Sequence, residues 1–438
     1  MQRYNQLINN KFNSFDLLII ILFSFLPISF VFGNAAININ IFLIDVVFLL
    51  YCFHYKDWSW LKSKVFIVLF IFYLFLILNS VFAYYIILEN EIEGIKRSLL
   101  FIKFIILVFA ISTLLINENK LNLINKSWLI ISLIIIFDIF YERYFGKNLL
   151  GYTSPNYRRV VSFFKDEMVV GGYMLCFGFV SITYFLNTKL NKKLTLIYLL
   201  ILLIIPISIF LTGERSNFIK SIFIFLIITF FLNKEKYLFN GKILLPIFIL
   251  IITCIIYLNE NLKTRYSQFF IRISAAESTL DFYQKFENIK YIAHYDTAIK
   301  IFKNYPLTGV GNKNFRNECS KDIYFEKKIK LSDARCSTHP HQIHFELLSE
   351  QGIIGYFFII FSIIFFLFKN IKVFINTSNI NHLSNISYII VFFLPVLPGA
   401  GIFSTFNGSI FWIIFSLCYL NYKTANTKKI NQNYNLSK

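Results

Sequence analysis

Long apolar blocks recur along almost the whole of this chain, and they constrain its fold more than any other feature. Each block has about 15–20 residues, the length of α-helix that crosses the hydrocarbon core of a bilayer. A transmembrane β-barrel would show alternating rather than continuous apolar residues. With 57% hydrophobic and only 15% charged residues, the chain also lacks the polar side chains that a soluble protein of 438 residues needs for its surface. We therefore expect an all-α, polytopic helical membrane protein.

The sequence predicts about twelve spans in one membrane domain over residues 1–438. The predicted spans are 17–33, 39–53, 65–84, 98–116, 128–142, 169–187, 196–212, 216–232, 243–258, 353–368, 387–402 and 409–421. The first block follows an Asn-rich start without a small-residue cleavage pattern, so it is expected to be a retained span. A large, partly helical loop over 259–352 is expected between spans 9 and 10, with a helix over 275–306. The Asn- and Lys-rich composition of 422–438 predicts a disordered tail.

The distribution of Lys and Arg predicts how the chain crosses the membrane. Every second short connection is rich in lysine, which is typical of cytoplasmic loops. Both termini are then expected in the cytoplasm, and the 259–352 loop in the periplasm. The net charge of +19 is mainly a topology signal, and basic residues scattered over many loops argue against a nucleic-acid partner.

Five arginines on the predicted outer side require a further explanation. Arg215 lies in LTGERSN between spans 7 and 8, where a charge at the membrane edge is costly and therefore a functional candidate. Arg265 and Arg272 are seven residues apart and would share one face of a helix, while Arg158 and Arg159 lie in the fifth connection. Guanidinium groups suit the bidentate recognition of phosphate. We expect these arginines to bind a lipid-linked pyrophosphate at the membrane–water boundary.

The stretch HPHQIHFELLSEQGIIG, residues 339–355, places three histidines just before the tenth predicted span. Histidine titrates near neutral pH, so His339, His341 or His344 can act as a general base. Zinc binding is chemically compatible with such a cluster, but no matched second group of ligands is evident. The structural alternative is that the histidines cap a helix or lie at an interface. Glu346 and Glu350 follow on the same predicted helix and are expected to be solvated or to cap it.

Two of the six cysteines, Cys319 and Cys336, lie in the large loop. In an oxidising periplasm they can form a disulfide, although two free thiols are the alternative. A disulfide would lower the conformational entropy of the unfolded loop and so stabilise the folded protein by about 3 kcal/mol. It would also fix the segment directly ahead of His339.

Three stretches of the chain resemble the O-antigen ligase family, which shares this region with O-antigen polymerases. The first is His341-Gln342, then nine residues, then Gly-x-x-Gly at Gly352 and Gly355. The second is NYPLTGVGNKNF, which is similar to a Pro-x-x-Gly-x-Gly turn in the family's large periplasmic loop. The third is TGERS at 212–216, which is similar to a short outer turn that bears a functional arginine.

This resemblance implies a metal-independent, cofactor-free glycosyltransferase of the bacterial inner membrane that acts in lipopolysaccharide biosynthesis. The donor would be a glycan on undecaprenyl pyrophosphate, and the acceptor a sugar hydroxyl of the lipid A core. His341 matches the proposed general base of the family, and Arg215 matches its first arginine. For the second arginine, Arg265 is the first choice and Arg272 the second.

Two other functions remain open at this stage. A surface-polysaccharide polymerase would use the same donor chemistry with a second lipid-linked glycan as acceptor. A membrane transporter or flippase belongs to a different class and predicts charges deep within several spans. Here most charges outside the loops gather at one outer boundary instead, which favours the transferase.

Overall fold

The computed structural model describes residues 12–87, 92–165, 167–188, 191–232, 241–274, 290–327, 329, 331–395, 397–399 and 401–436. The regular secondary structure of these residues is helical, as the apolar blocks predicted. Within the described ranges, eight helical segments are long and apolar enough to cross a membrane. They are α2 (Ser14–Phe32), α3 (Asn34–Tyr55), α4 (Lys64–Ile86), α5 (Glu93–Leu99) with α6 (Ile102–Leu114), α7 (Glu118–Phe145), α10 (Lys192–Leu211), η4 (Gly241–Ile243) with α13 (Leu244–Leu258), and α18 (Ile343–Thr377).

The other four predicted spans also fall on helices. They coincide with the run of α8 (Val170–Tyr173), η3 (Met174–Gly178) and α9 (Phe179–Leu186), and with α11 (Arg215–Phe231), α19 (Ile380–Phe392) and α20 (Thr405–Leu436). The apolar helices Val170–Leu186 and Ile380–Phe392 are shorter than a regular span. The structure therefore supports a polytopic helical membrane protein, with eight segments that meet the length and hydropathy of a span by themselves.

The span predicted over 387–402 is wrong in its second half. Helix α19 ends at Phe392, and the described residues that follow are not helical. The cause is local, because Pro395 and Pro398 lack the backbone N–H that a helix requires and disfavour a helical residue before them. The freed backbone of Pro398 and Gly399 lies in the candidate site described below.

The tail also differs from its prediction. Helix α20 continues to Leu436, so a helix occupies much of 422–438, for which composition predicted disorder. Once a long helix is nucleated, each further residue adds a hydrogen bond at little extra entropic cost, even in a polar sequence.

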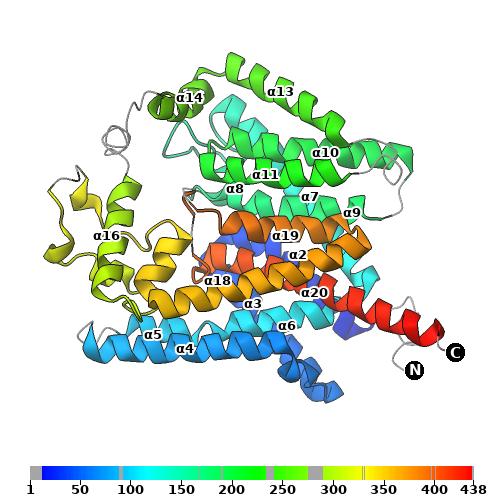
Figure 1. Cartoon of the computed structure of the whole chain (residues 1–438). Coiled ribbons are helices and arrows are strands. Elements are labelled where there is room, and N and C mark those ends of the chain that lie inside the picture. The colour runs from blue at the N-terminus through cyan, green and yellow to red at the C-terminus, as the bar shows by residue number, and fades with distance from the viewer. Residues whose placement is uncertain are drawn as a thin grey trace.

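The helices lie side by side, with the two chain termini at one end and the large loop at the other (Figure 1). This arrangement agrees with a topology in which both termini lie on the side opposite to the loop. Many large apolar side chains on the helices are exposed, among them Ile21, Phe42 and Phe137. In water such exposure would be unfavourable, whereas in a bilayer these side chains face lipid.

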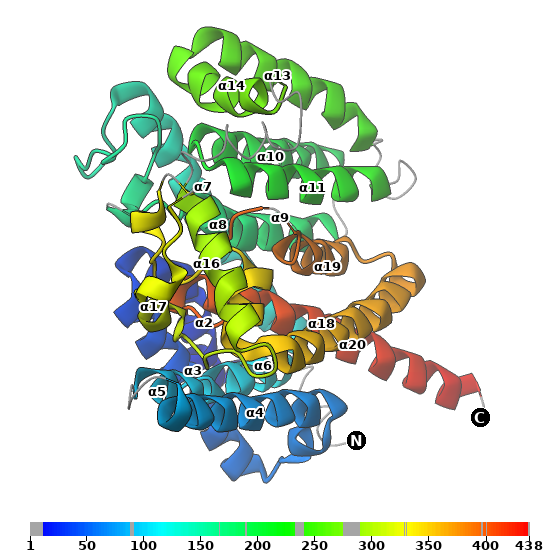
Figure 2. The same ribbon diagram turned by 60° about the vertical axis from the view of Figure 1, so that its left-hand side comes forward.

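The large loop forms a cap over the ends of the helices that lie opposite to the chain termini (Figure 2). It contains α14 (Glu260–Ser274), α16 (Lys290–Asn304) and α17 (Phe315–Glu318), together with the short 3₁₀ turns η5 (Asp322–Tyr324) and η6 (Ser332–Ala334). Of the helix predicted over 275–306, the second part is α16, and residues 275–289 lie outside the described residues. Ala298, Ile301 and Phe315 form a small apolar core that holds the cap together.

Candidate active site

His341 lies at the turn that leads into α18. Its backbone has a φ of +61°, a left-handed conformation that is uncommon for a residue other than glycine. The next residue, Gln342, is the N-cap of α18, and its side chain accepts hydrogen bonds from the backbone N–H groups of His344 (2.7 Å) and Phe345 (3.1 Å). The pair His341-Gln342 therefore has a structural basis, because the cap at Gln342 fixes the start of α18 and with it the orientation of the preceding His341.

Three histidines form a cluster at this turn, which we call the histidine cluster: His294, His339 and His341. The ring of His341 lies 4.2 Å from that of His339 and 5.3 Å from that of His294, measured between centroids. Its Nε2 is 2.9 Å from the hydroxyl oxygen of Ser337. Burial, with the two neighbouring histidines, lowers the pKa of His341 to about 3, so its imidazole is neutral at physiological pH.

His339 and His344 have different surroundings. Burial and the nearby cations Lys313 and Arg316 lower the pKa of His339 to about 3. His344 is directed away from the cluster, because its Nδ1 is 3.1 Å from the hydroxyl of Tyr356 and its Nε2 is 2.8 Å from the carbonyl oxygen of Phe393. The three histidines of the 339–344 segment are thus not equivalent, and His294 of α16 takes the third place in the cluster.

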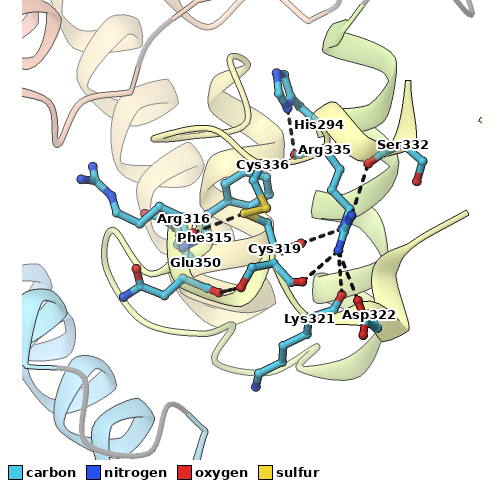
Figure 3. Close-up of a disulfide and its surroundings, with 12 residues drawn as sticks. His294, Phe315, Arg316, Cys319, Lys321, Asp322, Ser332, Arg335, Cys336 and Glu350 are labelled. Atoms are coloured by element: carbon cyan, nitrogen blue, oxygen red, sulfur yellow. Dashed lines mark hydrogen bonds and ion pairs between the residues drawn. A yellow bond between two sulfur atoms is a disulfide. The ribbon is translucent and has the colours of Figure 1, made fainter. Parts of the chain in front are cut away.

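A disulfide joins Cys319 to Cys336, the pair expected to bridge, and it stabilises the base of the histidine cluster (Figure 3). Next to it, the guanidinium of Arg335 donates hydrogen bonds to the carbonyl oxygens of Cys319 (2.9 Å) and Ser320 (2.8 Å). The carbonyl oxygen of Arg335 in turn lies 2.9 Å from Nδ1 of His294. The crosslink therefore holds residues 335–337, which contact His294 on one side and His341 on the other.

The two glycine motifs of the loop pack against each other. Helix α18 is kinked at Gly352, whose φ is +61°, and the N–H of Ile353 donates to the carbonyl oxygen of Pro306 (2.8 Å). A Cβ at Gly352 would overlap the backbone of Leu307, and one at Gly309 would lie 2.5 Å from the carbonyl carbon of Glu350. The spacing of both motifs thus follows from one close backbone contact that only glycine permits.

Glu346 and Glu350 are fully buried, which differs from the solvated or capping positions expected from the sequence. Glu346 forms an ion pair with the ammonium of Lys313 (2.5 Å), and Glu350 accepts a hydrogen bond from the backbone N–H of Lys313 (2.8 Å). The turn after the glycine motif brings the lysine to these carboxylates. Buried carboxylates need such partners, because an unpaired charge in the interior is very costly.

A second group of charges surrounds the turn between α10 and α11. Gly213 in this turn has a φ of +72°, and its carbonyl oxygen accepts a hydrogen bond from Nε of Arg265 (2.6 Å). A Cβ at Gly213 would lie 2.6 Å from the carbonyl oxygen of Arg158 and 3.0 Å from Nε of Arg265. Tyr266 stacks on Phe210, with the ring centroids 4.4 Å apart, and so anchors α14 to the end of α10.

Arg159, Arg215 and Arg265 form what we call the arginine cluster. Burial and then the positive charges of Arg159 and Arg215 lower the pKa of Arg265 to about 10, which indicates that the three guanidinium groups are close together. Glu214 lies among them, and its carboxylate accepts hydrogen bonds from the backbone N–H of Gly171 (2.9 Å) and the amide of Asn217 (2.6 Å). Several guanidinium groups around one carboxylate leave an excess of positive charge at this place.

The other two candidate arginines are less well supported. The side chain of Arg158 donates to the hydroxyl of its neighbour Tyr157 (2.8 Å) and is half-buried. Arg272 lies in the last turn of α14, but its side chain is outside the described residues. Arg265, the first choice for the second arginine, lies against the 212–216 turn.

The non-helical segment Pro398–Gly399 links the two clusters. The backbone N–H of Gly399 donates to the carbonyl oxygen of His341 (2.7 Å). The hydroxyl of Ser216, next to Arg215, donates to the carbonyl oxygen of Pro398. We call this pair of residues the bridging segment, because the single peptide group between Pro398 and Gly399 connects the histidine turn to the arginine turn.

The sequence of this site matches a known family model. Residues 198–360 match the model described as O-antigen ligase. This stretch carries the O-antigen ligase family domain. The resemblance expected from the motifs is thereby confirmed over this stretch, which includes Arg215, Arg265 and His341 but not Arg158 or Arg159. No curated protein matches the chain.

Three residues of the site, two inside the matched stretch and one before it, were not predicted from the sequence. His294 and Lys313 lie in the large loop, and only their places in α16 and after the Gly-x-Gly turn hinted at a role. Arg143, in the last turn of α7, donates to the carbonyl oxygens of Leu211 and Arg158. It therefore ties the fifth connection to the arginine turn, a contact that no local pattern predicts. In the described residues, no group of three His, Cys, Asp or Glu side chains has an arrangement that could hold a metal ion.

Proposed function

We propose that this protein transfers a glycan from undecaprenyl pyrophosphate to a sugar hydroxyl of the lipid A core. His341 is the general base, and Arg215 and Arg265 bind the pyrophosphate of the donor, with Arg159 beside them. The lipid tail of the donor remains in the bilayer while its pyrophosphate reaches the outer ends of the helices. The reaction takes place on the periplasmic side of the inner membrane.

The bridging segment is the observation that supports this assignment most strongly. Residues far apart in the chain meet there, since the N–H of Gly399 donates to the carbonyl oxygen of His341 and the carbonyl oxygen of Pro398 accepts from Ser216 beside Arg215. One peptide group thus joins the turn of the proposed base to the turn of the cationic site, the two functions that a transfer from a pyrophosphate to a hydroxyl requires. A transporter path would not need a base at this place.

The reaction exchanges one bond at the anomeric carbon for another. The acceptor oxygen bonds to the anomeric carbon as the bond from that carbon to the phosphate oxygen breaks, and undecaprenyl pyrophosphate leaves with the electron pair. His341 takes the proton of the acceptor hydroxyl, a step that typically contributes about 10²–10⁴-fold. The guanidinium groups stabilise the charge that develops on the leaving pyrophosphate more than they stabilise the ground state.

The protonation of His341 is coupled to substrate binding in this proposal. Without donor, burial and nearby histidines keep the imidazole neutral, so it can accept a proton. A pyrophosphate bound beside it would favour the imidazolium and raise the pKa of His341. The base would therefore gain strength when the donor is in place.

The test is to express His341→Ala and Arg215→Ala variants in the native host and analyse its surface glycans. Lipid A core without long glycan, with polymer accumulating on the carrier lipid, identifies a ligase. Products that carry a single repeat identify a polymerase. His54→Ala, at an exposed histidine at the end of α3 far from the loop, is the matched control. Normal glycans in both site variants would refute an enzymatic role of this site.

A further inference from the structure

A cavity of 490 Å³ opens beside the histidine cluster, and its described lining residues do not include Arg159, Arg215 or Arg265 of the arginine cluster. Its walls come from the turn between α2 and α3, from α5, from residues 164–169, from the large loop and from the first turn of α20. His339 contributes to the wall, and its ring is 4.2 Å from that of His341. The size is that of a site for a small molecule or a sugar residue.

Four cations line this cavity: Arg97, Lys165, Lys313 and Arg316. Glu167 is the acidic residue among the described lining residues. Two of the cations have carboxylate partners, because Arg97 pairs with Glu93 (2.7 Å) at the surface and Lys313 pairs with the buried Glu346 (2.5 Å). The remaining positive charge comes from Lys165 and Arg316.

Arg316 is the cation best placed to bind a ligand. Its Nη2 donates to the carbonyl oxygen of Thr338 at 3.4 Å, a long hydrogen bond, and in the described structure its buried Nε has no hydrogen-bond partner. Figure 3 shows the guanidinium directed away from the disulfide. A buried donor without an acceptor is costly, so an anion that accepts this N–H would be favoured.

Other lining residues add groups suited to a sugar. The first turn of α20 lines the cavity with Thr405, Phe406 and Asn407, and the N–H groups of a first helical turn have no acceptor within the helix. The N-terminus of a helix also favours a negative charge. The rings of Phe164 and Phe403 give apolar faces against which the C–H groups of a pyranose can pack.

We propose that this basic cavity binds an anionic sugar of the acceptor, one that carries a phosphate or carboxylate group, and directs its hydroxyl to His341. This proposal rests on the proposed function, in which the arginine cluster holds the donor. The donor and acceptor then approach the same base from two sides. Arg316 and Lys165 bind the anionic group, and the aromatic wall holds the sugar ring.

The first test measures binding of glucose 6-phosphate, as the probe, to the full-length protein in phosphatidylcholine nanodiscs, with glucose as the uncharged match. We expect glucose 6-phosphate to bind and glucose not to. Arg316→Gln should weaken binding by about 10-fold or more, the effect of losing one charge-assisted hydrogen bond, and Arg316→Lys by less. Lys303→Gln, at an exposed cation of α16 outside the cavity, should leave binding unchanged.

Three results would overturn the proposal. The first is equal binding of the two sugars. The second is unchanged affinity for glucose 6-phosphate in an Arg316→Gln variant whose thermal unfolding transition shows that it is folded. The third is loss of glucose 6-phosphate binding in phosphatidylglycerol nanodiscs, which would assign the cavity to a lipid headgroup.

A second measurement separates this proposal from the proposed function. In a transfer assay with purified donor and acceptor, Arg316→Gln should raise the KM for the acceptor by about 10-fold and leave the KM for the donor unchanged. A raised donor KM instead would assign the cavity to the pyrophosphate and overturn the inference. If the wild-type protein transfers nothing, the proposed function fails, while the binding of glucose 6-phosphate still decides what the cavity holds.

Discussion

The arginine cluster and the histidine cluster are held in place by different means. Arg215 begins α11, and Arg265 of α14 is held against the end of α10 by its hydrogen bond to Gly213 and by the neighbouring Tyr266. The histidines lie on a long loop, where a disulfide and the hydrogen bonds of Arg335 replace helix packing. The cationic site is fixed by packing against the helices. The general base lies on a loop, so its position depends on the disulfide and on the hydrogen bonds of Arg335. The two should therefore respond differently to perturbation.

The largest expected effect lies on the arginine side. Arg215→Ala should lower the transfer rate by about 10²–10³-fold, because it removes charge stabilisation at the leaving pyrophosphate. Arg265→Ala should lower it by a similar order, and Arg272→Ala, on the same helix, should leave it close to wild type. The rates are measured with the purified protein and a lipid-linked donor. A larger loss in Arg272→Ala than in Arg265→Ala would reverse our assignment of the second arginine.

A smaller loss is expected when the arginine turn is distorted without removal of a charge. In Gly213→Ala the new Cβ would lie 2.6 Å from the carbonyl oxygen of Arg158, and the left-handed backbone itself costs roughly 1–2 kcal/mol. The turn should shift and displace Arg265, which we expect to lower transfer by about 10-fold. Gly151→Ala is a suitable control, since that glycine also has a positive φ (+85°) but has no atom within 4 Å of its Cβ position. Equal activity of the two variants would contradict a positioning role for Gly213.

Breaking the disulfide should disturb the histidine cluster and leave the arginine cluster unchanged. Cys319→Ser with Cys336→Ser opens a crosslink between residues 17 positions apart, which we expect to cost the loop about 3 kcal/mol of stability. Transfer should fall several-fold while donor binding, measured separately, remains at the wild-type level. Cys254→Ser, at an exposed cysteine of α13, controls for the loss of a thiol. Weakened donor binding in the double variant would show that the two clusters are not independently supported.

The smallest effect expected is a pH dependence of stability from the histidine cluster. The pKa of His339 and of His341 is lowered from 6.5 to about 3 by burial, so below pH 6.5 the unfolded chain binds protons that the folded protein does not. The folded state should therefore lose stability as the pH falls from 6.5 towards 3. Thermal unfolding at pH 7.5 and 5.0 measures this loss, and it should be smaller in His339→Asn with His341→Asn. The same pH dependence in wild type and variant would assign it to other groups.

The sequence determined the local features of this protein. Helix-forming apolar blocks are a property of consecutive residues, so each predicted span lies on a helix, and the prolines at 395 and 398 explain the one that ends early. The same holds for the N-cap at Gln342 and for the glycines at 309 and 352, whose spacing reflects backbone requirements within short segments.

Only the tertiary structure decided which residues distant in the sequence meet. Ser216 and Pro398 are 182 residues apart, and Asn79 contacts the carbonyl oxygen of Thr308 across 229 residues. No periodicity encodes such contacts, because they depend on how the loop closes over the helix ends. For that reason the pattern of arginines and histidines indicated the chemistry, while the places of His294, Lys313 and Arg316 emerged from the packing of the cap.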